Sequence, residues 1–146
     1  MSAPPARIRI THDDYHASHV GRTAAGDQFF ATTPFVPAID STGREFVAVY
    51  IFHPDGRFKD AVIDDVGPRE SLNLGAVAKL FERRVAELGS FEFCDIEVAP
   101  FRIERFGVEF GLIPQPPEDE DGGWWIILEP GDYMAFSEPF DGEYYT

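Results

Sequence analysis

The sequence has a single cysteine, Cys94, and no long apolar run. One cysteine cannot form a disulfide within the chain, so nothing in the sequence indicates an oxidising compartment. The longest unbroken apolar run covers residues 46–52, whereas a membrane-spanning helix needs roughly 20 residues. The first residues also lack the apolar stretch of a secretory signal. We therefore expect a soluble, cytoplasmic protein with no membrane partner.

Sequence patterns that identify several enzyme classes are absent as well. No stretch matches the glycine-rich dinucleotide pattern G-x-G-x-x-G or a phosphate-binding P-loop. No serine stands in the G-x-S-x-G pattern that places a nucleophile on a tight turn. We therefore predict no catalytic residue and no cofactor.

Positive charge is absent from residues 106–146, because all 12 Lys and Arg residues lie between Arg7 and Arg105. The whole chain has 26 Asp and Glu residues and a formal net charge of −14. Ten of these carboxylates lie in the last segment: Glu109, Glu118, Asp119, Glu120, Asp121, Glu129, Asp132, Glu138, Asp141 and Glu143. Such a surface repels nucleic-acid phosphates and anionic lipids and attracts cations. A basic protein is the favoured partner class, and no nucleic-acid partner is expected.

Length and composition indicate one folded unit, residues 1–146. A chain of this size buries about 68–70% of the surface that its unfolded form exposes. Hydrophobic residues make up 44% of the sequence and include fourteen phenylalanines, which is enough for a packed core and argues against disorder.

One stretch, from about Asn73 to Leu88, has the periodicity of an amphipathic helix. Asn73 or Ser71 can cap its start, and Gly89 can end it in a left-handed conformation. The rest of the chain alternates strand-like segments with turns. We therefore predict an α+β fold, in which this helix packs on a bent, mainly antiparallel sheet. The apolar residues that form the stripe of the helix are Leu74, Val77, Ala78, Phe81, Val85 and Leu88.

Strand-like segments are those with alternating or continuous apolar residues between turn residues. Residues 46–52 are apolar at every position, which is typical of a central strand covered on both faces. Residues 34–44 and the acidic, proline- and glycine-rich residues 113–123 are predicted loops. The predicted strands are residues 7–10, 19–23, 28–33, 46–52, 58–64, 93–105, 108–113, 124–129 and 133–138.

Three of the four histidines lie close together in the sequence, at His12, His16 and His19. In a helix this spacing would place them on one face, where three imidazoles could bind zinc or another transition metal. Asp13 or Asp14 could then orient a ring as a hydrogen-bond acceptor. The alternative interpretation is a polar connection between two strands.

Two C-terminal features are candidates for partner binding. One is the run of four consecutive carboxylates, which is either a solvated loop, a docking patch for a basic partner or, as a third option, a calcium ligand set. The other is the aromatic chain end, which either docks on the sheet or presents rings to a partner. The residues predicted for this surface are Glu118, Asp119, Glu120, Asp121, Phe140, Asp141, Tyr144 and Tyr145.

Four parts of the chain carry a resemblance to a known family. They are residues 10–22 with 26–30, residues 50–56 with HPDG, residues 96–111 with PFR, and the final PFDGEYYT. These stretches resemble a family of small, acidic bacterial proteins, some of which are labelled formate hydrogenlyase regulatory protein HycA. The resemblance extends over nearly the whole chain and implies no particular site residue. The helix-turn-helix or basic surface of a DNA-binding repressor is absent from the sequence.

These observations favour a non-enzymatic, acidic protein-binding module, such as a regulator, an inhibitor or an immunity-type protein. The alternative is a metal-binding protein or metal-dependent enzyme that uses His12, His16 and His19. A third possibility is a small-ligand pocket lined by phenylalanines, with Trp124 and Trp125 at its mouth.

Overall fold

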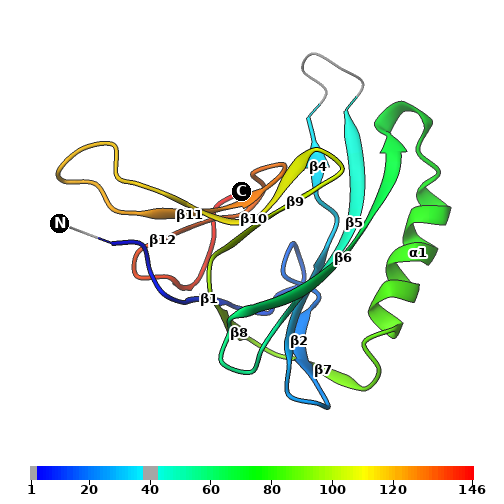
Figure 1. The fold of residues 1–146 in the computed structure, drawn as a ribbon, viewed down its shortest axis with the longest axis horizontal. Helices are drawn as coiled ribbons and strands as arrows, with labels where there is room; N and C mark the ends of the chain where they lie inside the picture. The colour runs from blue at the N-terminus through cyan, green and yellow to red at the C-terminus, as the bar shows by residue number, and fades with distance from the viewer. Residues whose placement is uncertain (1–2, 38–42) are drawn as a thin grey trace.

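The computed structural model describes residues 3–37 and 43–146. Within these residues the chain forms three mostly antiparallel β-sheets and one α-helix, α1 (Leu74–Ala86), which lies on the outer side of the largest sheet (Figure 1). The predicted fold class is thus confirmed. The strands are β1 (Ile8–Ile10), β2 (Val20–Thr23), β3 (Gln28–Thr32), β4 (Phe35–Val36), β5 (Arg44–Phe52), β6 (Phe58–Pro68), β7 (Phe91–Phe93), β8 (Ile96–Val98), β9 (Phe101–Arg105), β10 (Val108–Gln115), β11 (Trp125–Glu129), β12 (Ala135–Ser137) and β13 (Asp141–Gly142), and a short 3-10 helix spans Arg69–Ser71.

The largest sheet is built around β5. This strand pairs with β3 on one side and β6 on the other, and β2 and β7 follow beyond β3. Side chains of β5 alternate between the two faces: Phe46 and Tyr50 pack toward the second sheet, whereas Val49 and Ile51 pack toward α1. This confirms the prediction of a central strand covered on both faces.

The second sheet has the strand order β12-β11-β10-β9. Its inner face packs against the largest sheet and encloses the main hydrophobic core. For example, the rings of Phe46 and Phe110 meet edge to face with centroids 5.0 Å apart. The largest fully buried side chains of the protein are Tyr50, Phe29, Phe30, Phe46, Phe52, Phe110, Phe136, Ile8, Ile10, Ile96, Leu112 and Ile126.

The third sheet holds the C-terminal segment in place through backbone pairing. Its central strand β1 pairs antiparallel with β8 and parallel with β13. Gly142 has a φ of 109° and lies against Thr11, so that a side chain at this position would clash. Tyr145 then exchanges backbone hydrogen bonds with Ala135 of β12, at 2.8 and 2.9 Å. Of the two alternatives for the aromatic chain end, the structure thus shows docking of its backbone on the sheets.

Helix α1 is covered over only part of its length. The Asn73 side chain accepts a hydrogen bond from the Ala76 amide at 3.0 Å, which caps the start of the helix as predicted. Near the other end, Val85 packs against strands of the largest sheet. Leu74, by contrast, is 73% exposed. The predicted apolar stripe therefore exists, but the sheet covers only its C-terminal half.

Several predicted boundaries differ from the structure. Residues 93–105 form parts of three strands, because the chain leaves the largest sheet after Phe93, joins the third sheet, and enters the second sheet after Pro100. Strand β10 runs to Gln115 through its pairing with β11, so the acidic loop spans residues 116–124. The predicted loop 34–44 contains β4, which pairs with β5, and its residues 38–42 lie outside the described residues.

In the described part of the chain, no helix combines the length and apolar character that crossing a membrane requires.

Candidate functional site

The histidine segment, residues 11–19, folds as a series of turns between β1 and β2. Asp13 shapes these turns, because its Oδ1 accepts hydrogen bonds from the backbone amides two and four residues later, at 2.9 and 3.0 Å. Hydrogen bonds of this local kind compete with helix formation. The helix that would align His12, His16 and His19 on one face is therefore not formed.

All three imidazole rings pack against aromatic side chains, and two of the three share a neighbour. His12 and His19 both contact Phe93, with ring centroids 5.3 and 5.4 Å away. His16 instead contacts Tyr133, at 5.1 Å. Among residues 3–37 and 43–146, no group of three or more His, Cys, Asp or Glu side chains is arranged to hold a metal ion. In this arrangement the rings serve as packing groups.

A hydrogen-bond network joins the histidine segment to the C-terminal segment. The Tyr144 hydroxyl donates to Asp13 Oδ2 at 2.5 Å and accepts from the His16 amide at 3.2 Å. Partial burial disfavours the ionised carboxyl, but the hydrogen bonds from Tyr144 and two backbone amides outweigh it and lower the pKa of Asp13. Burial and the bond to Asp13 raise the pKa of Tyr144 to about 12. Tyr144 is thus a structural link.

Burial favours the neutral form of two of the histidines. Burial lowers the pKa of His16 against the opposing effect of Asp13, and burial together with the charge of His12 lowers the pKa of His19. His19 Nδ1 lies 2.8 Å from Ser18 Oγ. A neutral imidazole has one nitrogen that accepts and one that donates, so these rings offer polar contacts without positive charge.

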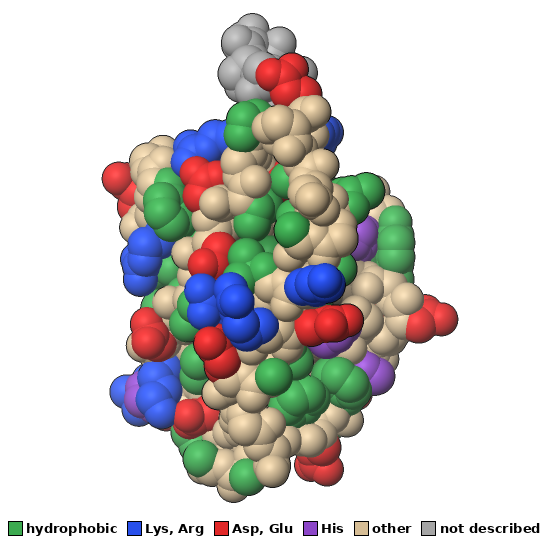
Figure 2. Space-filling model, turned by 90° about the vertical axis from the view of Figure 1, so that its right-hand side faces the viewer, with side chains coloured by type: hydrophobic (Ala, Val, Ile, Leu, Met, Phe, Trp, Pro, Cys, Tyr) green, Lys and Arg blue, Asp and Glu red, His purple; other side chains and the backbone are tan. Residues whose placement is uncertain are grey.

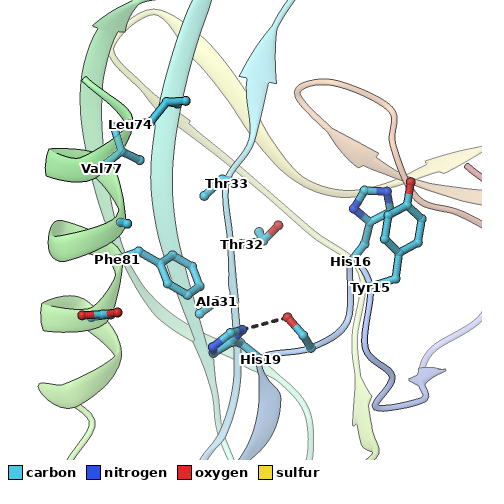
Figure 3. A pocket seen from close by; sticks show the side chains of 12 residues that line it. Tyr15, His16, His19, Ala31, Thr32, Thr33, Leu74, Val77 and Phe81 are labelled. Carbon is cyan, nitrogen blue, oxygen red and sulfur yellow. Dashed lines mark hydrogen bonds between the residues drawn. The ribbon is translucent and has the colours of Figure 1, made fainter. Parts of the chain in front are cut away.

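A groove separates the N-terminal half of α1 from β3 and the histidine segment (Figure 3). Its volume is about 440 Å³, within the range of about 300–1,000 Å³ that is usual for small-molecule sites. Leu74, Val77 and Phe81 project from α1 toward β3 across it (Figure 3). We call this cavity the helix groove. Its lining residues are Tyr15, His16, Ser18, His19, Ala31, Thr32, Thr33, Leu74, Val77, Ala78, Phe81 and Glu82.

The helix groove has apolar walls and little charge. No Lys or Arg is among its lining residues, and Glu82 is their only carboxylate. Thr32 is already hydrogen-bonded, with its hydroxyl 2.6 Å from that of Tyr133. The neighbouring cations of α1, Lys79 and Arg83, are exposed and do not line the cavity.

The acidic loop lies at the opposite end of the molecule from α1, where it joins β10 to β11 (Figure 1). Asp119 shapes it by accepting a hydrogen bond from the Asp121 amide at 3.1 Å. Beside the loop, the rings of Trp125 and Tyr145 pack with centroids 5.6 Å apart. These rings are 38% and 65% exposed, respectively. A hollow of about 660 Å³ is bordered by the loop and Trp125.

The carboxylates of residues 106–146 remain largely unpaired in the fold. Among the residues that the structure describes, Glu109 is the one member of this group that forms an ion pair, with Arg102 at 3.5 Å. The four consecutive carboxylates, residues 118–121, are all exposed. Like-charge crowding is also present at Glu129, where burial and the charges of Asp132 and Glu109 raise the pKa.

The predicted partner-binding residues lie in three separate places in the structure. Residues 118–121 and Tyr145 lie at the acidic loop. Phe140 and Asp141 lie beside Arg9 at the edge of the third sheet. Tyr144 is half-buried and bonded to the histidine segment, as described above.

Some residues of these sites were not singled out from the sequence. Glu138 adds a carboxylate to the acidic loop, since its carboxyl group lies beside Gly123. Trp125 was expected at the mouth of a phenylalanine pocket and instead flanks this loop. The helix groove contains one phenylalanine, Phe81. The only signal for the groove was the apolar stripe of α1, which does not reveal whether anything covers it.

No protein-family model matches the sequence, and searches of curated proteins and of solved structures also find no match. The family resemblance noted from the sequence therefore stays a prediction.

Proposed function

We propose that this protein is a non-enzymatic binding protein whose acidic loop, with Trp125 and Tyr145, binds a basic region of a partner protein. The observation that carries the proposal is the exposed run of carboxylates at residues 118–121, none of which forms an ion pair in the described structure. Unpaired, solvated anions give a field that attracts a cationic surface before contact.

The two ends of the molecule differ in charge balance, which supports this choice of face. On the side of α1, Lys and Arg side chains are interspersed with Asp and Glu (Figure 2). There Arg84 of α1 pairs with Asp64 of β6 at 2.7 Å, and Arg69 pairs with Glu45 at 3.2 Å. Such pairs cancel at a distance, so the unbalanced charge at the acidic loop dominates long-range steering.

The exposed aromatic pair supplies contact energy that charge alone does not. Tyr and Trp are enriched where protein surfaces bind one another, because they bury a large area with little loss of side-chain entropy. Trp125 stands on β11, and a backbone bridge to β12 holds Tyr145. Both rings also stack well with arginine side chains of a partner.

The test is a pull-down with purified protein, compared at low salt and at about 0.5 M salt, where the Debye length falls to a few ångströms. A partner of high pI should be retained at low salt and released at high salt. Changing all four carboxylates of residues 118–121 to amides should abolish its retention. Changing Trp125 to Ala should weaken retention even at low salt, because it removes contact area.

A matched control separates the loop from net charge. It changes four exposed carboxylates outside the loop to amides, and it alters the net charge by the same amount. A partner that is lost equally from both variants, or from neither, would overturn the proposal. The control positions are Asp60, Glu70, Glu92 and Glu104.

A further inference from the structure

Specific hydrogen bonds position the helix that borders the groove. At one end of α1, Asn73 caps the helix directly after the turn that leaves β6. At the other end, Arg84 bonds Asp64 at 2.7 and 2.8 Å and bonds Glu87 of the same helix turn. The helix is thus capped at its start and joined to β6 near its end, and Leu74 and Val77 lie across a gap from Thr33 (Figure 3).

We propose that the helix groove binds a small organic cation with an apolar body, such as an arylalkylamine. The class follows from the lining, which combines aliphatic side chains of α1, aromatic rings and one carboxylate, Glu82. This proposal does not depend on the acidic loop, which lies at the other end of the molecule (Figure 1).

The apolar walls select for an apolar body. Leu74, Val77 and Ala78 line one side and Ala31 lines the other. A ligand that covers Leu74, which is 73% exposed, removes apolar surface of both molecules from water. A volume of about 440 Å³ is large enough for a ring and a short alkyl chain.

The polar groups select for a positively charged head. Glu82 offers a carboxylate that forms no ion pair in the described structure. The rings of Tyr15 and Phe81 also line the groove, and a cation placed over the face of such a ring is stabilised by the ring quadrupole. Burial lowers the pKa of His16 and His19 and so favours the neutral imidazole, which can accept a hydrogen bond without repelling a cation.

An anionic ligand would lack a counterpart in this groove. No Lys or Arg lines it, and the protein carries a formal net charge of −14. A carboxylate or phosphate ligand would therefore enter against both the local and the overall field. A neutral ligand would gain the apolar contacts but not the attraction of Glu82.

The test compares three probes that share one body: 4-phenylbutylamine, 4-phenylbutan-1-ol and 4-phenylbutanoate. Each is titrated into the intact protein, and binding is followed by backbone amide chemical shifts. We expect the amine to bind with a Kd at least about tenfold below that of the carboxylate, a difference typical of one partly solvated ion pair with ring contacts. Shifts should centre on Phe81, Ala31 and His19.

Variants on α1 separate the shape of the groove from its charge. Ala78→Trp should fill the groove and abolish binding of all three probes, whereas Ala76→Trp, at an exposed helix position that does not line it, should leave binding unchanged. Glu82→Gln should remove most of the preference for the amine. Glu104→Gln makes the same change in net charge on β9 and should preserve it.

Equal affinity for the three probes, or tighter binding of the carboxylate, would overturn the proposed ligand class. Binding that persists in Ala78→Trp would overturn the location. Because neither readout involves the acidic loop, failure here leaves the proposed partner binding to be judged by its own experiment.

Discussion

On the face of the largest sheet that meets the second sheet, Phe46 and Tyr50 have no exposed surface, whereas on the face that meets α1 only Val85 of the helix is buried. Both faces are built from the same strand, β5, whose residues 46–52 are all apolar. The difference comes from the covering element. A second sheet presents inward-facing side chains along its whole width, but a helix touches a sheet along one narrow stripe.

We therefore expect the face of the largest sheet that meets the second sheet to contribute most to stability. The face that meets α1 is the one that leaves space for binding. Close packing between the sheets stabilises the fold and leaves no space for a ligand. The partly covered helix contributes less hydrophobic stabilisation, and the uncovered half of its stripe borders the groove. Functional surfaces are commonly found where packing is least complete.

The largest expected effect is a cavity between the two sheets. Phe110→Ala removes a fully buried ring that meets Phe46 at 5.0 Å, and such truncations lower the free energy of unfolding by about 3–5 kcal/mol. Urea denaturation followed by tryptophan fluorescence measures this loss. A loss below about 1.5 kcal/mol, the size expected of a half-buried position, would mean that this face is no better packed than the helix side.

An intermediate effect is expected where Tyr144 joins the C-terminal segment to the turns that line the groove. Tyr144→Phe removes the hydroxyl that bonds Asp13 and the His16 amide. The expected loss is about 1 kcal/mol at pH 7, in the range for a hydrogen bond to a charged group that is partly solvated. Tyr145→Phe is the matched control, because its hydroxyl has no hydrogen bond in the described structure.

The same substitution has a predictable pH dependence. The pKa of Asp13 is lowered in the folded protein, so its contribution to stability is complete above its unfolded value, near 3.8, and disappears as the pH falls through the folded value. In Tyr144→Phe the pKa of Asp13 should rise. The stability gap between the two proteins should therefore narrow below about pH 4. A gap of constant size from pH 7 to pH 2.5 would contradict the role given to this hydrogen bond.

The sequence predicted the elements whose pattern is set by burial. Residues 46–52 identify a strand covered on both faces, and Asn73 identifies the start of the helix. For the histidine segment the sequence left two interpretations open, and the structure shows the polar connection between two strands. Asp13 accepts hydrogen bonds from two backbone amides of the segment, which prevents the helix that would have aligned the histidines. The spacing of residues in the sequence carries no information about this competition for backbone amides.

The sites were predictable only in part for a related reason. The acidic run at residues 118–121 lies in a loop between paired strands, so its exposure follows from the sequence itself. The groove depends on how far the helix stands from β3, which is decided by contacts distant in sequence. One such contact is the bond between Arg84 and Asp64. The spacing of apolar residues that includes Leu74 is the same whether the sheet covers these side chains or leaves them exposed.

The smallest expected effect tests whether the N-terminal half of the apolar stripe of α1 is exposed to solvent. Leu74→Ala should change the free energy of unfolding by no more than about 0.5 kcal/mol, because the side chain is 73% exposed and alanine favours helix. Val85→Ala, a buried position on the same stripe, should cost about 1.5 kcal/mol, the transfer free energy of two methyl-sized groups. Both are measured by urea denaturation under the same conditions. If Leu74→Ala costs as much as Val85→Ala, the N-terminal half of α1 is packed in solution, and the groove on which the ligand proposal rests is closed.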